Sequence, residues 1–129
     1  MKFKNLLFPR TACWLLTLAF PVGSHAAELQ ASDGMQYDSF GMSAATLGGF
    51  ALIGAANSGT GSGGYQGSAY LFRNLDTATG TITQNATLIA SDSRSGDFFG
   101  SVAIYGDISI VGSYTNTIGN NYEIGRAHV

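Results

Sequence analysis

Several residue types are nearly absent from this 129-residue chain. Cysteine and tryptophan occur once each, proline twice, and charged side chains make up only 11%. The segment before Ala27 contains every one of the scarcest: Cys13, Trp14, Pro9, Pro21, and the only two lysines, Lys2 and Lys4. The remainder has no cysteine to form a disulfide, so burial and hydrogen bonding must stabilise its fold.

Histidine is also scarce, which excludes the commonest catalytic and metal sites. His25 lies before Ala27 and His128 close to the C-terminus, so Ser-His-Asp, Cys-His and zinc arrangements lack a member between them. The glycine-rich residues 61–64 lack the Lys-Ser/Thr of a phosphate-binding loop. We therefore assign no catalytic, cofactor-binding or metal-binding residue, and expect neither enzyme activity nor a cofactor.

Basic charge is low from Ala27 onward. Three arginines (Arg73, Arg94 and Arg126) stand against eight acidic residues, which gives a net charge of 3 − 8 = −5. An acidic, lysine-free surface repels phosphate backbones. We expect no nucleic-acid partner.

The segment 1–26 has the order of a signal peptide. Basic residues precede an apolar run over residues 11–20, and small residues follow, with Ser24 and Ala26 placed for cleavage after Ala26. The apolar run is much shorter than the roughly 20 residues of a membrane-spanning helix. We expect a secreted, periplasmic or cell-surface protein without a transmembrane segment.

The C-terminal tail, residues 124–129, matches the translation of a DNA-sequencing adapter. The codons ATC-GGA-AGA-GCA-CAC-GTC, part of a common DNA-sequencing adapter, translate as the sequence of residues 124–129. We expect these residues to be adapter read-through, with the true protein continuing past Glu123.

An internal repeat organises the rest. With a shift of 59, residues 27–41 match residues 86–100 at eight of fifteen positions, and a shift of 58 continues the match. We therefore divide the chain into a signal peptide (1–26), a first repeat (27–85), a second, incomplete repeat (86–123) and the tail (124–129).

Each repeat is expected to form short antiparallel strands. Residues 42–47 and 50–55 predict a hairpin around Gly48-Gly49, and the second copy repeats it around Gly106-Asp107. Residues 67–73 predict a third strand and residues 81–90 a fourth. Four strands at this spacing are typical of a β-propeller blade, and roughly four to eight blades close such a ring. The fold class is all-β, with about one and a half blades of a larger propeller.

The pattern resembles the FG-GAP repeat of the integrin α-chain propeller and of bacterial exported proteins. The resemblance rests on Phe40-Gly41 followed by Gly54-Ala55, and on Phe99-Gly100 followed by Gly112-Ser113. We expect both phenylalanines to pack between adjacent sheets and Gly54 and Gly112 to leave space where sheets crowd. The resemblance implies a non-catalytic scaffold that binds a protein or glycan ligand, as in cell adhesion. The alternative is an accessory propeller of an exported hydrolase whose catalytic part lies downstream.

Calcium is the cofactor that the resemblance raises. Many FG-GAP blades carry an acidic calcium loop in the hairpin after Phe-Gly, but a two-residue turn cannot supply six or more oxygen ligands. Calcium is therefore expected only in blades missing from this chain. Asp33 with Asp38, and Asp92 with Asp97, form a weaker metal hypothesis; the simpler interpretation is that Asp33 and Asp92 make local turn bonds to backbone amides.

Overall fold

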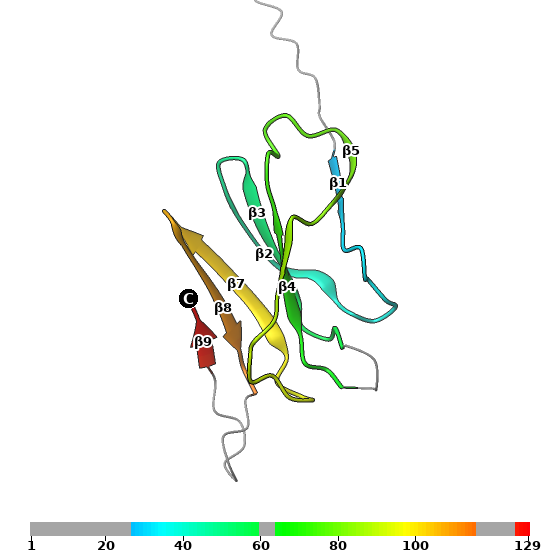
Figure 1. The fold of residues 1–129 in the computed structure, drawn as a ribbon, viewed down its shortest axis with the longest axis vertical. Coiled ribbons are helices and arrows are strands. Elements are labelled where there is room, and N and C mark those ends of the chain that lie inside the picture. Colours follow the sequence, from blue (N-terminus) through cyan, green and yellow to red (C-terminus); the bar gives the residue numbers. More distant parts are fainter. Residues whose placement is uncertain (1–26, 60–63, 116–125) are drawn as a thin grey trace, which may run out of the picture.

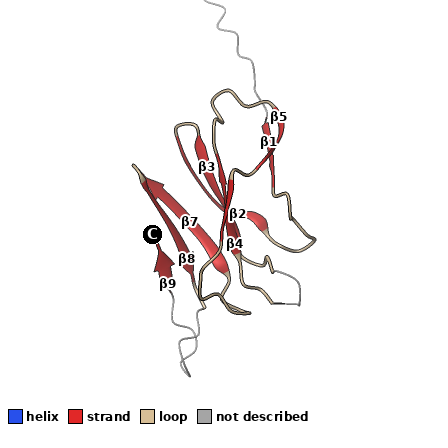
Figure 2. Ribbon diagram, viewed as in Figure 1, coloured by secondary structure: helices blue, strands red, loops and turns tan. Residues whose placement is uncertain are grey.

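The computed structural model describes residues 27–59, 64–115 and 126–129, and these residues form nine β-strands and no helix (Figures 1 and 2). The predicted signal peptide and residues 116–125 lie outside the described residues. The strands are β1 (Ala27–Gln30), β2 (Phe40–Leu47), β3 (Phe50–Ala55), β4 (Ser68–Phe72), β5 (Gly80–Thr83), β6 (Ala86–Leu88), β7 (Phe99–Tyr105), β8 (Ile108–Ser113) and β9 (Arg126–His128). The described part is all-β, as the sequence predicts.

The first sheet is a four-stranded antiparallel blade with the order β2-β3-β4-β6. Its β2-β3 hairpin turns at Gly48, whose φ is +55°, and the second hairpin turns at Gly106 with φ +54°. A positive φ at the first of two turn residues is the pattern of the type II′ turn, which suits the twist of paired strands. Both hairpins lie where the sequence predicts them.

The predicted fourth strand is divided in two. Residues 81–90 contain part of β5 and all of β6, and only β6 joins the four-stranded sheet. Asn85 makes the division: its backbone N–H donates to Leu71 O at 2.7 Å, and its side-chain Oδ1 accepts the Arg73 N–H at 2.8 Å. The strand β5 instead pairs in parallel with β1. A single strand over residues 81–90 was thus the wrong expectation.

The second sheet has the order β7-β8-β9 and repeats the geometry of the first. A bulge interrupts the β7-β8 register between Phe99 and Ser101, as one interrupts the β2-β3 register between Phe40 and Ser43. In β9, Ala127 pairs with Gly112, as Ala69 of β4 pairs with Gly54. The tail therefore occupies the third-strand position through backbone hydrogen bonds, which most side chains allow.

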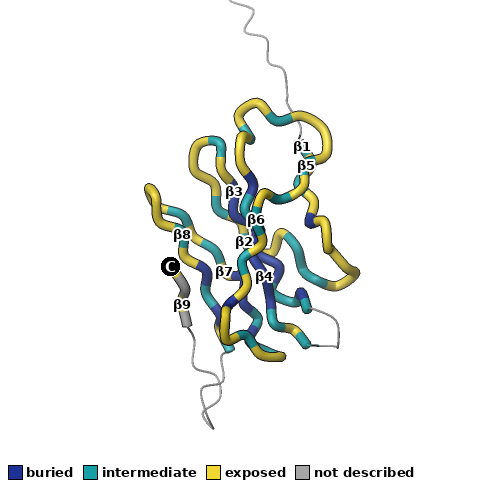
Figure 3. Tube along the Cα trace, in the orientation of Figure 1, coloured by how far each residue is buried: buried dark blue, intermediate teal, exposed yellow. Residues whose placement is uncertain are grey.

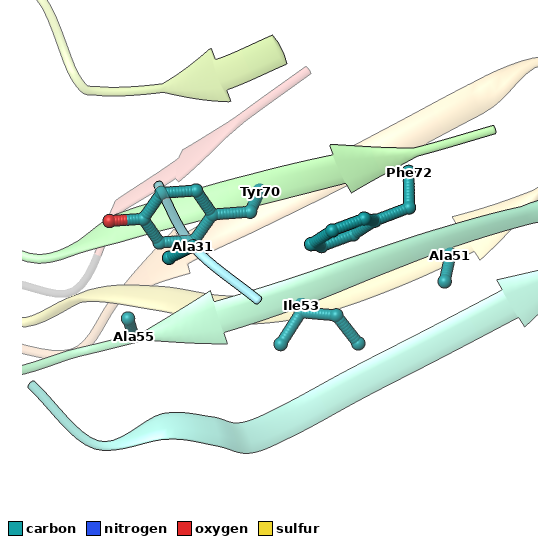
Figure 4. Close-up of a cluster of buried hydrophobic side chains, with 6 residues drawn as sticks. All are labelled: Ala31, Ala51, Ile53, Ala55, Tyr70 and Phe72. Carbon is teal, nitrogen blue, oxygen red and sulfur yellow. The ribbon is translucent and has the colours of Figure 1, made fainter. Parts of the chain in front are cut away.

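Buried residues concentrate along β3 and β4 of the first sheet (Figure 3). They form two clusters, because successive side chains of a strand point to opposite faces of the sheet. One cluster contains Ala31, Ala51, Ile53, Ala55, Tyr70 and Phe72, and Figure 4 shows Tyr70 and Phe72 of β4 beside Ile53 and Ala55 of β3. Leu29 and Ile82, from the paired strands β1 and β5, pack against this cluster. The small parallel sheet therefore covers that face.

The second cluster joins the two sheets. Leu52, Ala69, Ala90, Phe99 and Val111 form it, and Phe99 is only 2% exposed. A Cβ added to Gly54 would stand 1.7 Å from the carbonyl oxygen of Gly100, so the missing side chain is what allows the contact. The packing roles predicted for Phe99 and Gly54 are confirmed.

Phe40 packs differently from its counterpart Phe99. Its ring lies 5.6 Å from that of Tyr70 and 6.2 Å from that of Phe72, both in its own sheet. It therefore adds to the face covered by β1 and β5, and does not join the contact between the β2-β3-β4-β6 sheet and the β7-β8-β9 sheet. Phe40 therefore lies between the β2-β3-β4-β6 sheet and the small β1-β5 sheet, as the prediction of packing between adjacent sheets has it, although the neighbouring sheet is not the β7-β8-β9 sheet.

Candidate functional site

The repeated aspartates serve the scaffold in both copies. The Asp38 Oδ2 accepts the Met35 N–H at 2.7 Å, and the Asp97 Oδ2 accepts the Arg94 N–H at 2.7 Å. Such bonds from a carboxylate to a nearby backbone amide fix a turn. The local turn bond that the sequence suggested for Asp33 is therefore made by Asp38.

Asp33 instead faces the buried Tyr70. That tyrosine is 1% exposed and shares side-chain hydrogen bonds with Asp33, Ser68 and Ser58, and the two serine hydroxyls lie 2.6 Å apart. Burial first, and then the Asp33 carboxylate, raises the pKa of Tyr70 above its ordinary value of 10.0. Asp33 thus anchors the segment before β2 to the core.

Replacing Tyr70 with phenylalanine tests this anchor through its pH dependence. Because the folded-state pKa is raised, the unfolded chain ionises first, and stability falls as pH rises above about 10. Tyr70→Phe should lose about 1 kcal/mol at pH 7 and show a shallower alkaline decline, measured by urea unfolding between pH 7 and 11. Tyr105→Phe, at an 86% exposed residue, is the matched control. Equal alkaline slopes for wild type and Tyr70→Phe would contradict the assignment.

No group of three or more His, Cys, Asp or Glu side chains comes together within residues 27–59, 64–115 and 126–129. Asp33 and Asp38 have different partners, a phenol and a backbone amide. The metal hypothesis for these aspartates gains no support from this geometry, and calcium in other blades stays a prediction.

Three aromatic rings form a stack across the two sheets. The Tyr65 and Phe98 rings lie 5.7 Å apart and 10° from parallel, and the Phe98 and Tyr114 rings 5.2 Å apart and 15° from parallel. The Tyr65 carbonyl oxygen accepts the N–H groups of Gly96 and Phe98 at 2.9 and 3.2 Å. The loop after β3 is therefore fixed to the segment before β7. Figure 1 shows these connections at the lower end, opposite the two hairpin turns.

Backbone strain is concentrated in the segments leading into β2 and β7. Tyr37 and Ser39 have φ values of +75° and +60°, and their counterparts Gly96 and Phe98 have +89° and +51°. The two copies therefore follow the same path with different residues. A left-handed backbone costs a non-glycine residue about 1–2 kcal/mol, so Tyr37 and Phe98 are retained against a local cost.

A hollow of about 310 Å³ lies beside this stack. Its lining combines aromatic, thioether, carboxylate and carboxamide groups: Met35, Gln36, Tyr37, Asp38, Asn57, Gly59, Gly64 and Tyr65. Tyr65 belongs both to the lining of the hollow and to the stack. Tyr37 is 78% exposed and Tyr65 52% exposed. This hollow, with the stack, is the candidate binding site.

Reasoning from sequence did not single out these residues. It weighed the positions that the two copies share, and those positions build the scaffold. The positions at which the two copies differ were the useful signal. Met35-Gln36-Tyr37 of the first copy aligns with Arg94-Ser95-Gly96 of the second, within a segment that is otherwise similar. Differences between copies of a repeat indicate where a single site can lie.

The sheets and their connections define the class of protein. Two consecutive sheets of one repeated pattern, packed face to face through Phe99 and Gly54, are units of a β-propeller-like repeat. The model of the FG-GAP repeat matches residues 24–72 and 82–129, more than half of the chain, and the chain belongs to the FG-GAP repeat family. A search of curated proteins and one of solved structures each give no significant match.

The described residues include no helix that is long and apolar enough to cross a membrane.

Proposed function

We propose that this chain is part of a non-catalytic, exported scaffold whose loop end binds a protein or glycan at or beyond the cell surface. One observation carries the proposal: the exposed Tyr37, Tyr65 and Tyr114 gather in the loops at one end of the sheets, and Tyr37 and Tyr114 stand where the other copy has Gly96 and Ala56. Exposed loops on a rigid sheet framework are a common location for binding residues. Most of the repeated residues, in contrast, form turns and packing contacts, as Asp97 and Phe99 do.

The first segment of the sequence supports export, because residues 1–26 have the order of a signal peptide. The proposal includes no cofactor and no catalytic residue in this chain. Fold alone does not define the ligand, so the partner must be argued from the site.

A binding assay with paired variants tests the proposal. The purified full chain should bind saturably to at least one member of an array of glycans and purified extracellular proteins. Tyr65→Ala with Tyr114→Ala, at the loop end, should weaken that binding at least tenfold, because exposed aromatic side chains dominate many interfaces. Tyr105→Ala, beside the hairpin turn at the opposite end, should not. Absence of binding, or equal loss in both variants, would overturn the proposal.

A further inference from the structure

We propose that the hollow beside Tyr65 binds a single uncharged sugar ring, with Tyr37 and Tyr65 as its aromatic contacts; this inference rests on the proposed function and names its ligand class. The hollow is lined by two tyrosines, one carboxylate and two carboxamides. A sugar ring presents C–H groups on its face and hydroxyls around its edge. Aromatic ring faces pack against the C–H groups, and the side-chain oxygens of Asp, Asn and Gln accept hydrogen bonds from the hydroxyls.

Two of the polar groups, Asp38 and Asn57, are held in place without a ligand. Asp38 is fixed by the Met35 N–H, and the Asn57 Nδ2 donates to the Ser39 Oγ at 2.8 Å. The Asn57 backbone N–H donates to the Asp38 carbonyl oxygen at 3.2 Å, which ties the two residues together. Binding then needs little additional ordering of these groups, and such preorganisation favours affinity for a small ligand.

The Tyr65 ring is held in place as well. Phe98 stacks on it, and the Tyr65 carbonyl oxygen accepts two N–H groups from the segment that leads into β7. Its position therefore depends on the second sheet, although its hollow is lined by residues of the first repeat. Because Phe98 holds the Tyr65 ring in position by stacking on one face, the ring is suited to stack on a ligand ring.

Tyr37 gives the most direct evidence for a ligand. In the other copy the same backbone position is Gly96, with φ +89°, whereas Tyr37 holds φ +75° and remains 78% exposed. Glycine adopts this conformation without steric cost, and a tyrosine that is mostly in solvent gains little from packing. A contact with a bound molecule accounts for the tyrosine.

The size and polarity of the hollow favour a sugar over the other ligand classes. At about 310 Å³ it is at the small end of ligand pockets. A stable protein interface would bury about 800 Å² on each partner, far more than this hollow offers. A quaternary ammonium would suit the rings and the carboxylate. It could not use the two carboxamides, because it has no hydroxyl or N–H to donate.

Titration of the full chain with defined sugars tests the inference. The probes are the methyl glycosides of glucose, galactose, mannose and N-acetylglucosamine, with tetramethylammonium as the cationic comparison, followed by saturation-transfer NMR and calorimetry. At least one glycoside should bind, and tetramethylammonium should not. Tyr37→Gly should weaken glycoside binding at least tenfold while leaving the thermal midpoint equal or higher. Tyr105→Ala should leave glycoside binding unchanged.

Three results would overturn the inference: no glycoside binds, tetramethylammonium binds in their place, or Tyr37→Gly binds glycosides like the wild type. The thermal midpoint distinguishes a binding role of Tyr37 from a structural one, because the midpoint would fall in Tyr37→Gly if the tyrosine served packing. The proposed function and the sugar site can also be tested independently of each other. If the array detects a protein ligand that Tyr37→Gly still binds and the double variant of Tyr65 and Tyr114 does not, the scaffold proposal stands and the sugar site is wrong.

Discussion

Replacing Gly54 with alanine should destabilise the chain by about 3 kcal/mol or more, through overpacking of the contact between the two sheets. The added Cβ would stand 1.7 Å from the Gly100 carbonyl oxygen and 2.8 Å from its carbonyl carbon. Both are backbone atoms, so no side-chain rotation relieves the clash. Either β3 or β7 must move, which also disturbs the buried Phe99. Urea unfolding followed by circular dichroism measures the loss.

The matched control for this variant is Gly49→Ala. It adds the same methyl group, but the nearest atom is the Asp76 carboxylate oxygen at 3.0 Å, at the end of a side chain that can rotate away. Its cost should stay below about 1 kcal/mol, in the range of ordinary substitutions away from tight packing. Similar unfolding midpoints for the two variants would show that the sheets do not meet at Gly54.

The second large effect is expected for Phe99→Ala, which should cost about 3–5 kcal/mol. The ring is 2% exposed and packs with Leu52 and Ala69 of the first sheet and Val111 of the second. Its removal leaves a cavity in the contact that holds the sheets together. Since small domains are stable by only about 5–15 kcal/mol, this variant loses a large part of the total. Urea unfolding measures this loss too.

Tyr105→Ala is the control, because it truncates another aromatic residue of the same strand at a position that is 86% exposed. It should change stability by no more than about 0.5 kcal/mol. Phe99→Leu, which retains most of the buried volume, should fall between them and remains measurable if Phe99→Ala does not fold. A loss in Phe99→Ala no larger than in Tyr105→Ala would contradict the assigned packing.

Local features of the sequence determined the strands. Alternating apolar residues around two-residue turns defined both hairpins, and the repeated Phe-Gly and Gly pattern located the contact at Phe99 and Gly54. These signals are local because a turn type and a strand period depend on neighbours in the chain. The same signals predicted the all-β class before any pairing was known.

The tertiary structure alone decided which strands pair. Residues 27–30 and 86–89 occupy equivalent positions in the repeat, yet β6 completes the four-stranded sheet while β1 pairs in parallel with β5. Strand pairing depends on which edge is within reach, and sequence periodicity carries no such information. This is also why residues 81–90 could not be divided correctly in advance.

The candidate site was decided in the same way. Tyr37, Asn57 and Tyr65 are separated along the chain, and only the folding of their loops toward one end brings them to a common hollow. The sequence by itself determined the strands, the repeat and the tight glycine contact, because each follows from local chemistry. Only the tertiary structure showed which loop residues meet, because that depends on contacts between segments distant in sequence.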